Sequence, residues 1–230
     1  MRNTTSLIIG FALLAFVALG CSKIMPGSNS TGSSNTGPTT SGPTTTDPVS
    51  SGPFTPSGDA KADVTKMSAS FMKQPAFQAV MDGTGTTPVH MEVEYSAPNH
   101  YHIKNGASES TVIGSDMYVK MNGKWSKLPM SGAAGSIDKM RDTFTEEGLK
   151  RLTDAQSVGD DPVNGKPAYK YHFKIGSAEG GVPYETDLWV YKDSGLPAKI
   201  HLTYSSGILK EMTTTYAFDP NVKVEAPITE

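Results

Sequence analysis

Apolar and polar residues alternate along much of this chain, and few folds are compatible with a period of two. The clearest run is Tyr169–Ile175, in which Tyr, Phe and Ile alternate with Lys and His. A β-strand places successive side chains on opposite faces, so this run predicts a strand with one apolar and one polar face. Asn122-Gly123 and Asn164-Gly165 tolerate positive φ, and each pair predicts a tight hairpin turn beside such a strand.

Similar segments recur between short turns, which predicts roughly nine to eleven strands. They cover residues 77–81, 91–95, 101–104, 108–128, 169–175, 188–191, 198–204 and 208–218. Tight turns join consecutive strands in antiparallel order, and a sheet of many twisted strands curls. The predicted fold class is therefore mainly β (α+β), with a curled antiparallel sheet.

Two regions change to helical spacing. The first is Ala60–Phe71, with Asp59 as its cap and Pro75 as its stop. The second covers residues 136–152, where one apolar stripe contains Ile137, Met140 and Phe144. Thr145 then restarts the helical pattern, which carries Leu149 and Leu152. We expect two or three helices, and we expect them to cover the concave face of the sheet.

Residues 1–20 have the layout of an export signal. Arg2 precedes an apolar run over residues 7–19, which is too short for a comfortable membrane-spanning helix. Gly20 and Cys21 close this run, and Cys21 is the only cysteine of the chain, so no intramolecular disulfide can form. We interpret the segment as a bacterial lipoprotein signal peptide, with Cys21 as the site of lipidation. An ordinary secretory signal and an uncleaved N-terminal anchor are the alternatives.

Residues 21–58 are predicted to form a lipidated tether. Ser, Thr, Gly and Pro dominate this segment, with the quasi-repeats TGPTT at 36–40, SGPTT at 41–45 and SGPFT at 51–55. Such a composition cannot build a core, and a flexible coil of this length would average ~35 Å end to end. A diacylglycerol and a further acyl chain such as palmitate on Cys21, at ~0.8 kcal/mol per buried CH₂, would hold the protein on a bilayer.

Residues 59–230 have the length of one domain with its own core. The chain has 20 basic and 23 acidic residues, so loss of Arg2 with the signal leaves 19 against 23 and changes the net charge from −3 to −4. This balance and the lack of a basic stripe exclude a nucleic-acid partner and disfavour purely electrostatic docking to anionic lipid. We expect the protein to be a monomer.

Four segments of this domain follow a pattern found in bacterial envelope proteins. They are GKWSKLP at 123–129, VNGKPAYKY at 163–171, LWVYKDSGLPAKI at 188–200 and YAFDPNVKVEAP at 216–227. Together with the signal and the tether, the pattern resembles the LolA/LolB-like lipoprotein carriers and the related LppX/LprG-type lipid-binding lipoproteins, over nearly all of residues 60–228. The resemblance implies a half-barrel with helices plugging its open side and an apolar cavity that accepts acyl chains. Members of the group shuttle lipoproteins, carry glycolipids or sense envelope stress.

The apolar faces of the predicted strands and helices supply the candidate cavity lining. These residues are Met91, Val93, Tyr95, Tyr101, Ile103, Met117, Val119, Met121, Trp125, Met140, Phe144, Tyr171 and Phe173. Methionine adapts to irregular space and suits a pocket for lipid tails. For Trp125 and Trp189 the sequence favours core packing, with a position at the rim of the pocket as the alternative for Trp125. An ordinary sandwich or helix-on-sheet core explains the same pattern equally well.

The sequence gives little support for a metal site, a catalytic serine or a phosphate-binding loop. His100 and His102 would lie on one face of a strand about 7 Å apart, with His90 and Glu92 or Glu94 on a neighbouring strand, but the spacing fixes no third metal ligand. There is no G-x-S-x-G elbow around Ser115 and no phosphate-binding loop. We therefore expect a protein that is not an enzyme and has no cofactor and no metal.

These observations favour an exported, membrane-anchored bacterial lipoprotein that binds a lipid or acylated ligand in an apolar cavity, for transport or retention in the cell envelope. The competing hypothesis is a sensor or scaffold of the same shape, whose cavity is filled by its own side chains and whose partner is another envelope protein. A hydrolase of uncharacterised type is the third hypothesis.

Overall fold

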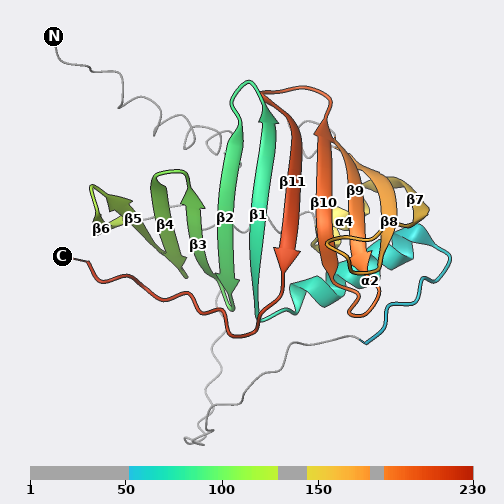
Figure 1. Cartoon of the computed structure of the whole chain (residues 1–230), viewed down its shortest axis with the longest axis horizontal. Coiled ribbons are helices and arrows are strands. Elements are labelled where there is room, and N and C mark those ends of the chain that lie inside the picture. Colours follow the sequence, from blue (N-terminus) through green and yellow to red (C-terminus); the bar gives the residue numbers. More distant parts are fainter. Residues whose placement is uncertain (1–51, 129–143, 177–183, 230) are drawn as a thin grey trace, which may run out of the picture. The chain divides into compact units, whose positions relative to one another are not determined.

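The structure, a computed structural model, describes residues 52–128, 144–176 and 184–229, which form one antiparallel sheet of 11 strands with accompanying helices (Figure 1). The strands are β1 (Ala76–Gly85), β2 (Val89–Ser96), β3 (His100–Asn105), β4 (Ser108–Ile113), β5 (Asp116–Met121), β6 (Lys124–Leu128), β7 (Leu152–Asp160), β8 (Ala168–Ile175), β9 (Tyr184–Tyr191), β10 (Pro197–Tyr204) and β11 (Leu209–Ala217). The helices within these ranges are α2 (Ala60–Met72) and α4 (Glu146–Lys150). The strand number and the mainly β class confirm the sequence prediction.

The sheet consists of two meanders that meet at the first and last strands. Its order is β6-β5-β4-β3-β2-β1-β11-β10-β9-β8-β7, and the pairing of β1 with β11 joins the two halves. Strands β6 and β7 form the two edges, so the sheet is not closed into a barrel. The observed architecture is consistent with the curled half-barrel that the sequence resemblance implies.

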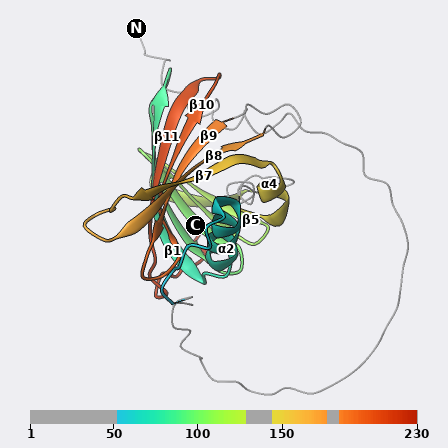
Figure 2. The same ribbon diagram turned by 90° about the vertical axis from the view of Figure 1, so that its right-hand side faces the viewer.

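The register divides the side chains of the sheet between two faces. On β1, Phe77, Ala79 and Met81 are buried, whereas the alternating Gln78 and Val80 are exposed. Figure 2 shows α2 and α4 on the same side of the sheet, the side toward which it curves. We call this side the concave face and the opposite side the convex face.

Helix α2 begins where the sequence predicts and packs against the concave face. The Asp59 side chain accepts hydrogen bonds from two backbone N–H groups of the first turn, at 2.9 and 3.1 Å, and so caps the helix. Val64, Met67 and Phe71 are almost completely buried. Burial of each of these side chains contributes about 1.5–3 kcal/mol, so packing and not local propensity stabilises this helix.

Phe71 is at the centre of an aromatic cluster that joins the helix to the sheet. Its ring centroid lies 5.2 Å from that of Phe77, 5.3 Å from those of Phe144 and Tyr216, and 6.1 Å from that of Phe218. Three of these pairs are edge-to-face, an arrangement in which the positive ring edge meets the negative ring face. The cluster connects α2, β1, β11 and the chain before α4.

The second predicted helical region agrees with the structure only in part. Thr145 caps α4 by accepting a hydrogen bond from the Gly148 N–H at 3.2 Å, as the predicted restart requires. The helix ends at Lys150, and Leu152 begins β7 instead of continuing the helical stripe. Ile137 and Met140 lie outside the described residues. None of the helices that the structure describes is long and apolar enough to cross a membrane.

Strand β7 is the main element that the sequence does not predict. Its sequence, LTDAQSVGD, lacks an apolar alternation, and most of its side chains are exposed. Two irregularities interrupt its pairing with β8, and Asp154 adopts a positive φ of 55°. A strand at the edge of a sheet with one exposed face carries a weak hydrophobic signal.

The folded domain also includes part of the predicted tether. Phe54 is buried, and its N–H donates to the Lys192 carbonyl at 2.8 Å. Its ring lies 6.2 Å from that of Tyr169, and the Lys66 ammonium lies 5.1 Å from its centroid. The domain therefore begins before Asp59, because the phenylalanine of the SGPFT quasi-repeat provides an apolar anchor that the earlier repeats lack.

A buried carboxylate ties this N-terminal segment to the helix and the sheet. Asp63 is 2% exposed; it accepts a hydrogen bond from the Ser57 N–H at 2.8 Å and another from the Tyr171 hydroxyl at 3.1 Å. Burial, followed by the charge of Asp63 and its hydrogen bond, raises the pKa of Tyr171, so the phenol stays protonated and donates. One side chain thus connects three separate parts of the domain.

We predict that Asp63→Ala lowers the free energy of unfolding by about 1.5–3 kcal/mol, because it leaves the Ser57 N–H and the Tyr171 hydroxyl without their acceptor. Urea unfolding of the full-length protein, followed by circular dichroism, measures this loss. Thr65→Ala, on the exposed side of the same helix, is the matched control and should cost less than about 0.5 kcal/mol. Equal stability of the two variants would contradict the assigned role of Asp63.

Candidate functional site

Nearly all described members of the predicted cavity lining share the concave face. Val93 lies opposite Ala79 and Ile103, which places β1, β2 and β3 in one register, and Tyr171 lies opposite Leu188 in the other half of the sheet. By the same register the concave residues include Met91, Val93, Tyr95, Tyr101, Ile103, Met117, Val119, Met121, Tyr171 and Phe173. These ten residues therefore share one face of the sheet.

Burial separates the concave residues into two groups. The first group is at most 4% exposed and belongs to the core under α2: it consists of Val93, Tyr95, Tyr101, Tyr171 and Phe173. Phe144, at 6% exposed, joins the same core through Phe71. These six side chains are therefore packed in the hydrophobic core of the domain.

The second group lies over β2, β3 and β5 and is less covered. Met91, Ile103, Met117 and Val119 are half-buried, and Met121 is 53% exposed. We call these five residues the apolar stripe. The stripe joins the buried core through Val112 of β4, which lies opposite both Tyr101 and Met117, whereas Ser110 of the same strand separates Ile103 from Val119.

A small pocket lies where the core meets the stripe. It has a volume of about 50 Å³ and is bounded by residues of α2, β1, β2, β3 and β11: Phe71, Phe77, Ala79, Met81, Val93, Tyr101, Thr214 and Tyr216. Pockets for small organic ligands have volumes of roughly 300–1,000 Å³, so this pocket alone cannot hold an acyl chain. A lipid tail would need the neighbouring stripe as well.

The structure corrects the predicted position of Trp125. The turn at Asn122-Gly123 forms with positive φ at both residues, as predicted, but the resulting register pairs Trp125 with Lys120. Lys120 points to the convex face, and its ammonium lies 5.6 Å from the Trp125 ring centroid. A shift of one position exchanges the two faces of a strand, which is why the sequence alone did not place this side chain.

Trp189 also belongs to the convex face, where it forms part of a second, smaller core. This core contains Val163, Ala168, Trp189 and Ala198, all at most 5% exposed. The Trp189 Nε1–H donates to the Asp161 carboxylate at 2.8 Å, and the Lys199 ammonium lies 3.7 Å from the ring. Core packing, the interpretation that the sequence favours for Trp189, is confirmed.

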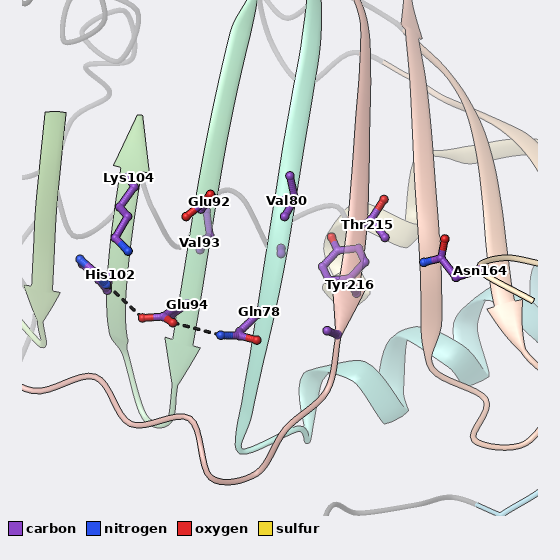
Figure 3. A pocket seen from close by; sticks show the side chains of 12 residues that line it. Gln78, Val80, Glu92, Val93, Glu94, His102, Lys104, Asn164, Thr215 and Tyr216 are labelled. Carbon is purple, nitrogen blue, oxygen red and sulfur yellow. Dashed lines mark hydrogen bonds and ion pairs between the residues drawn. The ribbon is translucent and has the colours of Figure 1, made fainter. Parts of the chain in front are cut away.

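The convex face carries a pocket larger than the one beside Phe71, and no local sequence pattern predicts it. This pocket, which we call the convex groove, has a volume of about 320 Å³ (Figure 3). Strands β1 to β3 contribute polar side chains to it: Gln78, Glu92, Glu94, His102 and Lys104. Thr215 of β11 and Asn164 of the β7–β8 turn complete its polar lining, with Val80 as an apolar residue between them.

Hydrogen bonds fix several side chains of this groove in place. The Glu94 carboxylate accepts from the Gln78 amide at 3.0 Å and from His102 Nδ1 at 3.0 Å (Figure 3). His102 Nε2 lies 2.9 Å from Glu109, which also accepts from the Lys120 ammonium at 2.7 Å. The chain of contacts crosses five strands, from β1 to β5.

These bonds favour the charged form of both carboxylates. The pKa of Glu94 lies below its ordinary value of 4.5, mainly because His102 donates to it, and the Gln78 bond acts in the same direction. The pKa of Glu109 is lowered mainly by the hydrogen bond from Lys120 and further by His102. Both groups are held as carboxylates on the convex face.

The histidines considered as metal ligands have other contacts. His100 Nδ1 lies 3.2 Å from the Val224 carbonyl of the C-terminal segment, and His90 lies 2.7 Å from Asp82. His102 is held between Glu94 and Glu109. Within the part of the chain that the structure describes, no group of three His, Cys, Asp or Glu side chains is arranged for a metal ion.

The fold defines a class, the LolA-like half-barrel, as the sequence resemblance implies. Among the similar solved structures, the first is the lipoprotein LppX of Mycobacterium tuberculosis, with 17% identity, a TM-score of 0.59, and coverage of 72% of this chain and 98% of that one. The second is LprF of Mycobacterium bovis, with 14% identity, a TM-score of 0.57, and coverage of 76% and 99%. The sequence matches no protein-family model and no curated protein. At these identities the likeness is one of fold.

We predict that the wild-type protein loses stability as the pH falls below about 4.5, and that Glu94→Gln reduces this loss. The sign follows from the lowered pKa of Glu94: its contribution is present above the unfolded-state pKa and disappears as the pH falls through the folded-state value. Urea unfolding midpoints between pH 3 and pH 7 measure the slope. Glu225→Gln, at an exposed glutamate of the C-terminal segment, should keep the wild-type slope. An unchanged slope in Glu94→Gln would contradict the prediction.

Proposed function

We propose that this protein is an exported bacterial lipoprotein, anchored to a membrane through Cys21, that binds an acyl chain along its concave face. The observation that carries this proposal is the apolar stripe, which extends the buried aromatic core of β1–β3 and α2 to the surface. Isolated apolar residues are normal on a protein surface, whereas contiguous apolar patches mark interaction sites. The stripe connects with the core along the row Tyr101, Val112 and Met117, with one residue from each of β3, β4 and β5.

The composition of the stripe suits a flexible tail. Three of its five residues are methionines, whose unbranched thioethers adapt to irregular shapes. An acyl chain that enters the 50 Å³ pocket beside Phe71 and continues over Ile103 and Met117 would leave water along its whole length. Burial at ~25 cal/mol per Å² then supplies the affinity without a need for polar contacts.

The N-terminal sequence supports the same proposal from a different direction. Arg2, the apolar run over residues 7–19 and Cys21 are typical of a lipoprotein signal. The Ser/Thr/Gly/Pro-rich segment that follows would let the domain reach lipid while it remains anchored. The fold is also similar to that of LppX, which is itself a lipoprotein, and this likeness supports the proposed membrane anchor.

The competing function is a sensor or scaffold that binds an envelope protein. The near-complete burial of Tyr171 and Phe173 favours it, because that part of the concave face is filled by the domain's own side chains. The two functions make different demands on the stripe. A carrier needs the stripe for lipid, whereas a sensor with a dry core binds no lipid there.

Titration of the full-length protein with a fluorescent 16-carbon fatty acid separates the two functions. We expect Met117→Glu to weaken binding about tenfold, because the loss of contact with about two CH₂ groups at ~0.8 kcal/mol each corresponds to that factor. Tyr118→Glu is the matched control, since the neighbouring residue is also half-buried but points to the convex face. Absence of probe binding, or equal weakening in the two variants, would refute the carrier function.

Lipidation is tested separately by metabolic labelling with an alkyne analogue of palmitate in the bacterium. We expect the wild-type protein and Ser22→Ala to incorporate the label and Cys21→Ser to incorporate none, because the thiol is the acceptor of the diacylglycerol. We also expect the labelled wild-type protein to be recovered in the membrane fraction. Failure of the wild type to incorporate label would favour the secretory or uncleaved-signal alternatives.

A further inference from the structure

The convex groove lies over hydrogen-bonded strands, and the side chains of these strands form its floor. Its base is the register of β11, β1 and β2, which sets Val80 directly opposite both Thr215 and Glu92. Glu94 and His102 are directly opposite each other on the next pair of strands and are joined by a hydrogen bond. Four neighbouring strands, β11, β1, β2 and β3, thus present their side chains to one space.

A hairpin from the far edge of the sheet provides the remaining wall. The tip of the β7–β8 hairpin folds over the convex face because Val163 packs with Trp189 and Ala198. A backbone bridge between Val163 and Lys166 closes the turn, and Asn164 has the positive φ of 52° that this turn needs. Asn164 thereby lines the same groove as Thr215 of β11, although β9 and β10 lie between β8 and β11 in the sheet.

The chemistry of the groove combines donors and acceptors with little net charge. Lys104 and Asn164 can donate, Glu92 and Glu94 can accept, and the Thr215 hydroxyl can do both. Val80 is 40% exposed between these groups and offers an apolar surface. A ligand that fits must therefore carry many groups able to donate and accept, together with a weakly polar face.

This requirement excludes the simplest charged ligands. Inorganic phosphate would lie against the carboxylates of Glu92 and Glu94, and like charges in close contact are costly. A bare cation would meet the ammonium of Lys104 and would find no cluster of metal ligands in the described chain. The volume of about 320 Å³ is too small for a globular partner and within the range of small-ligand sites.

We propose that the convex groove binds a neutral saccharide. Sugar hydroxyls donate to Glu92 and Glu94 and accept from Lys104 and Asn164, while the C–H face of the ring contacts Val80. The hydrogen bonds from Gln78 and His102 fix Glu94 in advance, which reduces the entropic cost of binding. This site is independent of the acyl-binding function, because it uses the opposite face of the same strands.

Saturation-transfer difference NMR of the full-length protein in nanodiscs tests the proposal. The probes are cellobiose, maltose and the N-acetylglucosamine disaccharide, with inorganic phosphate, followed by its ³¹P linewidth, as the anionic comparison. We expect at least one neutral disaccharide to bind and phosphate not to bind. Asn164→Asp keeps a residue that tolerates positive φ but removes the amide donor, and it should weaken binding about three- to tenfold.

Two variants, each of which places a larger side chain on the convex face, locate the binding site. Val80→Glu fills the groove and should abolish the disaccharide signal, whereas Thr203→Glu, at an exposed residue elsewhere on the convex face, should keep it. Both variants should bind the fluorescent fatty acid as the wild type does, so a failure of this site is distinct from a failure of the proposed function. Absence of any disaccharide signal, a signal that persists in Val80→Glu, or binding of phosphate alone would each overturn the proposal.

Discussion

The antiparallel pairing of β1 with β11 is the constraint on which the rest of this structure depends. It joins the two meanders and sets Ala79 opposite Tyr216 on the concave face and Val80 opposite Thr215 on the convex face. A slip of one residue would move the aromatic core to the outside and the polar groove to the inside. The concave pocket and the convex groove therefore share one structural origin.

The two faces of the sheet differ because different elements cover them. On the concave face, α2 brings Phe71 into the aromatic cluster, and Asp63 connects the helix to Tyr171 and to the segment before it. On the convex face the cover is the tip of the β7–β8 hairpin, which packs on Trp189. Each cover ends partway across the sheet, and the apolar stripe and the convex groove lie beside these covers. One thin sheet can therefore offer an apolar surface and a polar surface to two kinds of ligand.

Local rules were sufficient for the elements that carry strong short-range signals. Asp59 caps α2, Asn122-Gly123 and Asn164-Gly165 form turns with positive φ, and the alternation at Tyr169–Ile175 forms a strand. The same rules failed where the signal was weak or non-local. Strand β7 lacks alternation, and Leu152 fits a helical stripe and a strand equally well. Phe54 lies in a segment whose composition predicts no core, and only its contacts with the folded domain bury it.

The sequence by itself determined which residues alternate, where the turns fall and that one face of the sheet is rich in Met, Tyr and Phe, because these properties depend on neighbours within a few residues. Only the tertiary structure decided that Trp125 points to the convex face, that part of the predicted lining is filled core and that Asn164 lines the same groove as Thr215. Those outcomes depend on register and on contacts between residues far apart in the chain. No local pattern encodes them, because a period of two specifies two faces without specifying what covers each.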